Sequence, residues 1–341
     1  MKKPEALLDG YRYTWLVTGA AGFIGSNLVE VLLRGGQVVK GIDNFSTGRR
    51  QNLESLRASV GEGAWSRYTF IEGDINDAEQ CKRACVDARY VLHQAAVVSV
   101  PRSFKEPALS LHTNILGFLN ILLASREAGV ERLVYASSSS VYGSSEELPK
   151  VEKKIGSPLS PYALAKQADE LLAAMLLNEG TASSVGLRYF NVFGPRQNPM
   201  GDYAAVIPRF IRLLLAHQSP VIFGDGETSR DFCYIENVVQ ANILAALTPK
   251  EQLTSRVFNV AFGQQTTLNQ VFRHIRTIVA KKTGDSGILG VEPAYEAFRV
   301  GDIRHSLAEI SSARQVLGYA PAVSVEQGLE LLIDWTLHAK T

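Results

Sequence analysis

The sequence predicts an α/β protein built on a Rossmann-type, doubly wound parallel sheet. Short apolar segments alternate with longer helical patterns through the first 190 residues, and this alternation is typical of a parallel sheet covered by helices on both faces. A glycine-rich turn between the first strand and the first helix points to the same class of fold. With 341 residues and 46% hydrophobic composition, the chain can form a large core and a second, smaller lobe.

The predicted strands are short apolar runs that end in small or polar residues. They cover 14–17, 37–42, 68–71, 90–92, 133–136, 184–189 and 257–260. A first helix follows the glycine turn and ends near Leu33, a long one spans 107–128, and Ser160-Pro161 provides a cap and first turn for another. Further helices are predicted near 204–216, 236–247, 267–282, 307–317 and 325–338, and a flexible loop around 284–290.

The character of the chain changes at Asn191, where loops rich in Gly, Pro and Arg begin. The strand at 257–260 is predicted to return to the main sheet, so the two lobes would be interleaved. We therefore predict a Rossmann domain of residues 1–190 and 236–262, with a smaller α/β lobe of residues 191–235 and 263–341.

Charge and cysteine content exclude several classes of protein. A net charge of +1 and a pI near 7.7 give no sign of binding to nucleic acid or to anionic membranes. Three cysteines are too few for a disulfide framework or a cysteine metal site, so we expect no metal. Charged residues interrupt the N-terminal stretch, and we expect a cytoplasmic protein without a membrane-spanning segment.

The glycine turn predicts a dinucleotide site. Gly19, Gly22 and Gly25 lie between the first strand and the first helix, where backbone without side chains can approach a pyrophosphate at the helix N-terminus. Asp43 follows about 20 residues further on, in position to accept from the ribose hydroxyls. This acid favours NAD over NADP, whose 2′-phosphate it would repel. Asp74 and Ile75 end the next strand, near the expected adenine edge.

Ser138, Tyr162 and Lys166 are the candidate catalytic residues. Ser138 would sit just past the carboxyl end of a strand, where open parallel sheets hold their ligands. Tyr162 and Lys166 are four residues apart on a helix, so both side chains project from one face. An ammonium beside a phenol favours the phenolate and makes the tyrosine a usable base near neutral pH. A surface Tyr and Lys on an amphipathic helix is the alternative.

Together these features resemble the extended short-chain dehydrogenase/reductases, over essentially the whole chain beyond the first dozen residues. The segments that carry the resemblance are 17–25, 43–48, 98–103, 188–194, 204–208 and 224–234, together with the serine strand and Tyr-x-x-x-Lys. Within that family the chain is most similar to bacterial UDP-N-acetylglucosamine 4-epimerases of the O-antigen type.

The resemblance implies that Ser138, Tyr162 and Lys166 form a catalytic triad and that NAD stays bound through turnover. It implies NAD contacts from Gly19, Gly22, Phe23, Ile24, Gly25, Asp43, Asn44, Ser46, Thr47, Gly48, Asp74, Ile75, Gln94, Ala95, Ala96, Thr113, Tyr162, Lys166, Tyr189 and Val192. It implies UDP-sugar contacts from Ser99, Ser138, Ser139, Ser140, Tyr162, Asn191, Ala205, Val206, Phe210, Val221, Phe223, Arg230, Arg299, Asp302 and Ser306. A homodimer is also implied, formed by the 107–128 and 161–180 helices, although the sequence explains their apolar faces equally well as core.

Two positions bear on the reaction and the sugar. Related dehydratases have Asp-Glu after the catalytic hydroxyl, and related decarboxylases keep a Glu at the second position; this chain has Ser139 and Ser140. Ser306 occupies a position where some glucose-restricted members have a bulky Tyr, and it leaves room for an N-acetyl group at C2. An ordinary surface serine is the alternative for Ser306.

The function expected from the resemblance is C4 epimerisation of a UDP-N-acetylhexosamine, or of its uronic acid, through a transient 4-keto sugar. Tyr162 would take the proton of the sugar 4-hydroxyl while C4 gives hydride to the nicotinamide. UDP-glucose 4-epimerisation, UDP-sugar dehydration or decarboxylation, and an NAD-sensing scaffold on the same fold are the competing readings.

Overall fold

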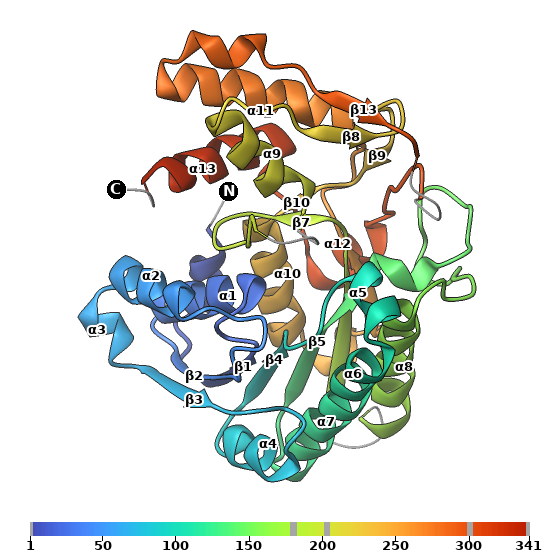
Figure 1. Cartoon of the computed structure of the whole chain (residues 1–341). Helices are drawn as coiled ribbons and strands as arrows, with labels where there is room; N and C mark the ends of the chain where they lie inside the picture. Colours follow the sequence, from blue (N-terminus) through green and yellow to red (C-terminus); the bar gives the residue numbers. More distant parts are fainter. Residues whose placement is uncertain (1–2, 178–182, 201–204, 299–302, 339–341) are drawn as a thin grey trace.

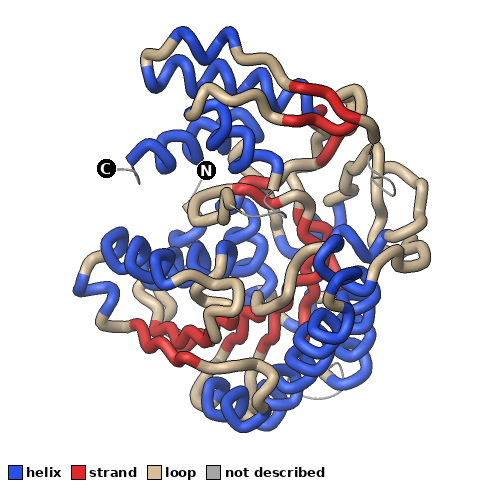
Figure 2. Tube along the Cα trace, in the orientation of Figure 1, coloured by secondary structure: helices blue, strands red, loops and turns tan. Residues whose placement is uncertain are grey.

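A parallel sheet forms the centre of the molecule. The structure is a computed structural model, and it describes residues 3–177, 183–200, 205–298 and 303–338. The sheet has seven strands in the order β11-β6-β5-β4-β1-β2-β3 (Figures 1 and 2). Every neighbouring pair is parallel, which confirms the predicted Rossmann-type α/β class.

The strands of this sheet lie where the apolar runs predicted them. They are β1 (Thr14–Thr18), β2 (Val38–Asp43), β3 (Tyr68–Glu72), β4 (Tyr90–His93), β5 (Arg132–Ser138), β6 (Ser183–Tyr189) and β11 (Val257–Val260). β4 and β6 are buried along their whole length, as expected for strands covered on both faces. β11 pairs with β6. The chain therefore returns to the main sheet after it has entered the second lobe.

Helices cover both faces of the sheet. One face carries α1 (Phe23–Arg34), α2 (Arg50–Val60) and α10 (Ile235–Leu247), and the other carries α4 (Ala78–Cys85), α7 (Phe118–Glu127) and α8 (Pro161–Leu176) (Figure 1). Each layer has its own apolar cluster, in which a fully buried leucine contributes roughly 1.5–3 kcal/mol. The cluster under α1 and α10 continues into the second lobe, which holds the two lobes together.

The predicted helix over 107–128 contains a π-helical turn. It consists of α6 (Pro107–Leu111), the π-helix η2 (His112–Gly117) and α7. This stretch is the one helix, among the described residues, that is long and apolar enough by length and composition to cross a membrane. It packs against α4 and α8, as a helix of the Rossmann layer does.

The second lobe lies above the carboxyl ends of the strands (Figure 1). Its main elements are α9 (Val206–Leu215), α11 (Leu268–Thr283), α13 (Val325–His338) and the pair β8 (Val221–Phe223) and β13 (Ala294–Glu296). A capping box of Thr267 and Gln270 starts α11. The smaller elements are α3 (Glu62–Trp65), α5 (Val100–Lys105), α12 (Ser311–Leu317), β7 (Val192–Phe193), β9 (Ser229–Arg230), β10 (Cys233–Tyr234) and β12 (Thr266–Thr267), with 3-10 helices η1 (Pro4–Leu8), η3 (Ser139–Tyr142), η4 (Lys250–Gln252) and η5 (Ser286–Gly290).

Two predictions for this lobe are wrong in detail. The helix predicted from 307 begins only at Ser311, because the chain before it is extended and Ala308 forms a bridge with Lys150. The segment around 284–290 forms η5 rather than an irregular loop, since the side chain of Ile288 is buried there.

Candidate functional site

The turn between β1 and α1 has no room for a side chain at Gly19 or Gly25. Gly19 has φ +66°, and a β-carbon there would lie 2.8 Å from the backbone nitrogen of Ala95. A β-carbon on Gly25 would lie 2.1 Å from the carbonyl oxygen of Gly19. Gly22 caps α1, which starts at Phe23, followed by Ile24. The turn therefore exposes backbone N–H groups at a helix N-terminus, which suits a pyrophosphate.

A narrow cleft opens at the carboxyl ends of β1 to β4. Most of the residues that line it are ones that the sequence predicted for the cofactor: Gly19, Asp43, Asn44, Ser46, Thr47, Ile75, Ala95, Ala96 and Thr113. Ile42 and Gly73 also line it and were not predicted, although both stand at strand ends, where backbone faces a ligand in this fold.

Asp43 is held in this cleft by backbone amides. Its Oδ2 accepts from the N–H of Ala21 (2.9 Å) and its Oδ1 from the N–H of Phe45 (2.8 Å). Burial raises the pKa of the carboxyl, and these two hydrogen bonds oppose the rise. A β-carbon on Gly48 would lie 2.7 Å from Oδ1, so glycine is required beside the acid. Two amides leave lone pairs free on a carboxylate, which can accept from ribose hydroxyls.

The π-helical turn places polar groups at the edge of the cleft. Thr113 lines the cleft, and Asn114, which sequence reasoning missed, is buried behind it. The Asn114 amide accepts from the N–H of Val97 (2.8 Å) and donates to its carbonyl (3.0 Å). Such π turns are frequent at functional sites. The turn ties the segment after β4 to the helix and so fixes the wall of the cleft.

Gln94 and Tyr189 belong to one hydrogen-bond network. The Tyr189 hydroxyl and the Gln94 amide bond to each other (3.1 Å) and both contact Asn242 of α10. Asn44 donates to Asp74 (3.0 Å). The side chains of these predicted cofactor residues are therefore held in place by hydrogen bonds to other residues of the protein.

The serine run lies at the end of β5. Ser138 is the last residue of the strand rather than the one after it, and its Oγ accepts from the N–H of Ser140 and bonds the Ser140 hydroxyl (both 3.1 Å). Ser139 and Ser140 start the 3-10 turn η3. Helix α8 packs against β5 and η3, which brings the start of α8 next to the serines.

Tyr162 and Lys166 share the buried face of α8. The cap predicted at Ser160 is confirmed, since its Oγ accepts from the N–H of Ala163 (3.1 Å). Lys166 is only 1% exposed, and its Nζ pairs with Asp169 (3.1 Å). Burial disfavours its charge, but Asp169 and Tyr162 outweigh burial and raise the pKa of the Lys166 ammonium. Lys166 therefore remains a cation beside the phenol of Tyr162.

Two of the predicted sugar contacts have unusual backbone conformations. Ser99 has φ +132° and Asn191 has φ +36°, a region that residues other than glycine rarely adopt. Ser99 caps α5 by accepting from the N–H of Arg102, and the Asn191 amide donates to the carbonyl of Asp231 (3.2 Å). Strained backbone of this kind clusters at functional sites.

The second lobe holds the remaining predicted substrate residues. Ala205 and Val206 form the N-terminus of α9, Val221 and Phe223 lie on β8, and Arg230 on β9 donates to the carbonyls of Ser229 and Arg304. Val192, a predicted cofactor residue, lies on β7. The N–H of Ser306 donates to the carbonyl of Ser229 (3.1 Å). Arg299 and Asp302 lie outside the described residues.

Phe210, a predicted substrate residue, lies on the inner side of α9. Its side chain is 1% exposed and packs edge to face on Phe272, with ring centroids 6.1 Å apart. The ring is part of the core between α9 and α11. The sequence placed it on the helix correctly, but the helix turns this position inward.

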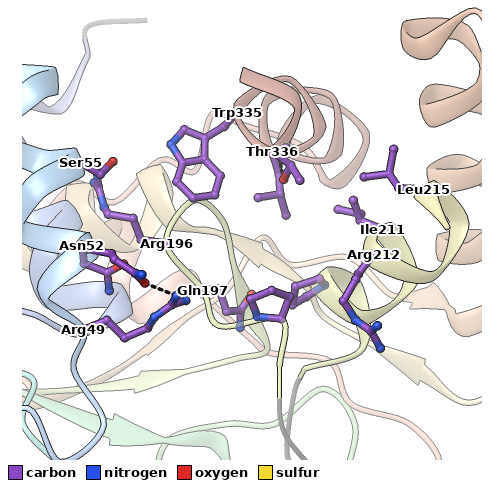
Figure 3. Close-up of a pocket in the computed structure, with 14 residues that line it drawn as sticks. Arg49, Asn52, Ser55, Arg196, Gln197, Ile211, Arg212, Leu215, Trp335 and Thr336 are labelled. Atoms are coloured by element: carbon purple, nitrogen blue, oxygen red, sulfur yellow. Dashed lines mark hydrogen bonds between the residues drawn. The ribbon is translucent and has the colours of Figure 1, made fainter. Parts of the chain in front are cut away.

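A cavity of about 540 Å³ lies between the lobes, and none of the residues that line it is a predicted cofactor or substrate residue (Figure 3). The start of α2 forms one wall, and α9 and Trp335 of α13 form another. Arg49, Arg196 and Arg212 line it. The charge of Arg196 is already compensated, because its guanidinium pairs with Glu30 and Asn27.

His93 is a structural residue. Its ring is buried and its Nδ1 shares a hydrogen bond with the Thr18 hydroxyl (2.9 Å). Burial, with a smaller effect of Lys166, lowers the pKa of His93 to about 3. In the described part of the chain, no group of three or more His, Cys, Asp or Glu is arranged to hold a metal ion.

Comparison with known proteins agrees with this architecture. Residues 15–261 match the model of the NAD dependent epimerase/dehydratase family. The chain is 36% identical to a UDP-glucose 4-epimerase of Mycolicibacterium smegmatis, over 94% of this chain and 97% of that protein. It is 32% identical to a UDP-glucuronate 4-epimerase of Thermodesulfobacterium geofontis, over 94% and 95%.

Among solved structures, a UDP-N-acetylglucosamine 4-epimerase from Methanobrevibacter ruminantium in complex with UDP-N-acetylmuramic acid is similar to this chain. The TM-score is 0.85 and the identity 35%, over 96% of this chain and 99% of that one. NAD is the cofactor for which the glycine turn, Asp43 and the cleft are suited. The chain belongs to the NAD dependent epimerase/dehydratase family.

Proposed function

We propose that this protein is an NAD-dependent UDP-sugar 4-epimerase that acts on UDP-N-acetylhexosamines. The observation that carries the proposal is the buried ammonium of Lys166 beside Tyr162, on a helix that packs against the serines at the end of β5. The relatives support UDP-sugar 4-epimerisation as the reaction. Their sugars differ, so the choice of the N-acetylated sugar depends on residues of this chain.

In this proposal each lobe binds a different ligand. Residues 1–190 and 236–262 bind NAD, and residues 191–235 and 263–341 bind the UDP-sugar. The N-terminus of α9 at Ala205 and Val206, with Arg230, would face the diphosphate, because helix N-termini and guanidinium groups both favour anions. Phe223 would contact the base.

The chain's own residues supply the proton transfers. The Tyr162 phenolate accepts the proton of the sugar 4-hydroxyl, and the ammonium of Lys166 stabilises that phenolate. Ser138 donates a hydrogen bond to the same sugar oxygen. When bound, NAD supplies the acceptor and later the donor of the hydride at C4. The 4-keto sugar turns over within the pocket while its UDP remains anchored, and Tyr162 returns the proton.

The choice of sugar is argued from Ser306. It lies on the strand-like segment that runs along β9, and a serine there leaves space beside C2. The choice of reaction is argued from Ser139 and Ser140. They provide no carboxylate beside Ser138, which disfavours the dehydratase and decarboxylase alternatives. The cytoplasmic location expected from the sequence remains a prediction.

The proposal includes a homodimer formed by α8 and the α6–η2–α7 stretch. These helices pack side by side, yet each also exposes large apolar side chains: Leu109, Leu116 and Leu123 at intervals of seven on one, and Leu164, Leu171 and Met175 on the other. Met175 is 73% exposed. A continuous apolar face of this kind, on two adjacent helices, fits a second copy of the chain.

The test is incubation of the purified protein, without added NAD, with UDP-GlcNAc, UDP-GalNAc, UDP-glucose and UDP-glucuronate in separate tubes. The configuration at C4 is then read by proton NMR. We expect the N-acetylated pair to interconvert fastest. Fastest conversion of UDP-glucose or UDP-glucuronate would refute the assignment of the sugar, and a folded, NAD-supplemented protein that converts none of the four would refute the activity.

A further inference from the structure

The buried face of α8 contains a carboxylate that the proposed mechanism does not use. Asp169 lies three residues after Lys166 and is fully buried. Its Oδ2 accepts from the Lys166 ammonium at 3.1 Å, while its Oδ1 is buried without a hydrogen-bond partner. Burying a carboxylate oxygen without a hydrogen-bond donor costs folding free energy. Packing alone therefore does not explain why the pair is buried.

The charges around this pair are otherwise balanced. Glu170, the next residue on the helix, is held by both arms of Arg188 on β6 (2.8 and 2.7 Å) and by the hydroxyl of Ser137. His93 on β4 stays neutral at ordinary pH, because burial lowers its pKa to about 3. Burial also raises the pKa of Tyr135 on β5 well above its usual value, so Tyr135 carries no charge. Asp169 is therefore the anion that faces Lys166 most directly.

The ammonium has one protein partner and two remaining donors. Lysine carries three N–H donors, and Asp169 is its one hydrogen-bond acceptor within the described ranges. The other two N–H donors are not used by Asp169. They are available to a bound cofactor and to the oxygen of Tyr162.

We propose that Asp169 is a positioning residue for the epimerase reaction: its carboxylate holds the ammonium of Lys166 in place and keeps it charged beside the Tyr162 hydroxyl. The inference rests on the proposed function, because it concerns the same tyrosine and lysine. Asp169 touches neither substrate nor cofactor in this role. It acts through Lys166, which can stabilise a negative charge on the Tyr162 oxygen only while it is itself an ammonium.

The charge of Asp169 itself depends on pH in the neutral range. Burial raises the pKa of its carboxyl to about 7, and Lys166 opposes this rise. Loss of the Asp169 charge removes the main group that opposes burial at Lys166, so the pKa of the buried ammonium falls. A nearby positive charge favours the phenolate, so removing the carboxylate, and with it the charge on Lys166, should disfavour the phenolate.

The test compares the wild type with Asp169→Asn, which keeps the shape and one acceptor but removes the charge. Phenolate formation is followed by absorbance at 295 nm against pH, and the spectrum of Tyr162→Phe in the same background is subtracted to isolate Tyr162. We expect the Tyr162 titration, and with it the acid limb of the kcat profile, to move to higher pH by about half a unit to one unit. KM for the UDP-sugar should change less than about twofold.

Asp169→Glu restores a carboxylate and should return the titration toward that of the wild type. If Asp169→Asn does not fold, Asp169→Ser, which is smaller and neutral, should show the same upward shift. A purely structural role would lower the melting temperature and leave the titration in place, and unchanged Tyr162 titrations in the neutral variants would overturn the inference. The absorbance measurement needs no turnover, so it remains decisive even if no UDP-sugar is epimerised.

Discussion

The side chains of Glu170 and Arg188 meet in a bidentate ion pair that joins helix α8 to strand β6. Arg188 donates from Nε to Oε1 at 2.8 Å and from Nη2 to Oε2 at 2.7 Å. Arg188 also donates to the carbonyl of Glu152 and lies over the ring of Tyr142, 4.9 Å from its centroid. Both charged groups are nearly inaccessible. The pair therefore sets the position of the helix that carries Tyr162 and Lys166.

Replacing Glu170 should destabilise the protein strongly. Glu170→Ala leaves the Arg188 guanidinium buried without its anion, which costs about 3–5 kcal/mol in comparable buried pairs. The measurement is the free energy of unfolding from denaturant titration. Glu54→Ala, at an exposed position of α2, serves as the control and should change it by less than about 0.5 kcal/mol. A loss below about 1 kcal/mol for Glu170→Ala would contradict the role given to the pair.

Tyr162→Phe should remove most of the activity and leave UDP binding intact. The phenol is the proposed acid and base, and such groups contribute about two to four orders of magnitude to the rate. The measurements are kcat by NMR of the C4 configuration and UDP affinity by calorimetry. Tyr295→Phe, at an exposed tyrosine of β13, is the matched control. Near-wild-type turnover of Tyr162→Phe would show that another group moves the proton.

Ser306→Tyr should restrict the enzyme to sugars without a substituent at C2. The larger ring would fill the space that we assign to the N-acetyl group. We expect kcat/KM for UDP-GlcNAc to fall by at least about tenfold, whereas the value for UDP-glucose should stay within about threefold. Equal losses for both sugars would mean that Ser306 does not lie beside C2.

Charges on the outer face of η2 and α8 should separate the proposed dimer. Leu116→Glu combined with Leu171→Glu places carboxylates in the centre of the apolar face, where a second copy would bury them. The mass in solution is measured by light scattering after size exclusion. The control is Leu331→Glu on α13, which is exposed elsewhere on the molecule. A wild-type protein that runs as a monomer would already exclude the dimer.

His93 should make the wild type sensitive to acid. Its pKa is about 3 in the folded state because the ring is buried, and near 6.5 when the chain is unfolded. Between these values the unfolded state binds the proton and the folded state does not, so stability falls as pH falls from 6.5 toward 3.

The size of this effect can be measured against His93→Gln, which has no titrating ring. Between pH 6.5 and 4.5 the wild type should lose about 2.5 kcal/mol more of its unfolding free energy than the variant does. The variant starts from a different unfolding free energy, because the hydrogen bond to Thr18 changes, so the slopes of stability against pH are compared. Parallel stability curves would mean that folding does not lower the pKa of His93.

Much of the fold and of the cofactor site could be predicted because the signals are local. Seven apolar runs gave the strands of the main sheet within one or two residues, and the spacing of Gly19, Gly22 and Gly25 located the turn before α1. Tyr162 and Lys166 could be placed on one helix face, since residues four apart on a helix always lie together. Asp43 could be identified as the acid beside the cofactor because it lies about 20 residues after the glycine turn.

Other features depend on contacts between distant segments and could not be read from residue types. The π turn that brings Asn114 to Val97, the inward direction of Phe210, and the outward direction of Leu116 and Leu171 all depend on how helices rotate against their neighbours. The pairing of Asp169 with Lys166 is close in sequence, yet its burial comes from the strands beneath. The sequence alone determined the class of fold and the chemistry that the chain carries. Only the tertiary structure decided which polar groups lose contact with water, because burial, and with it the energy of a charge, is set by segments far apart in the chain.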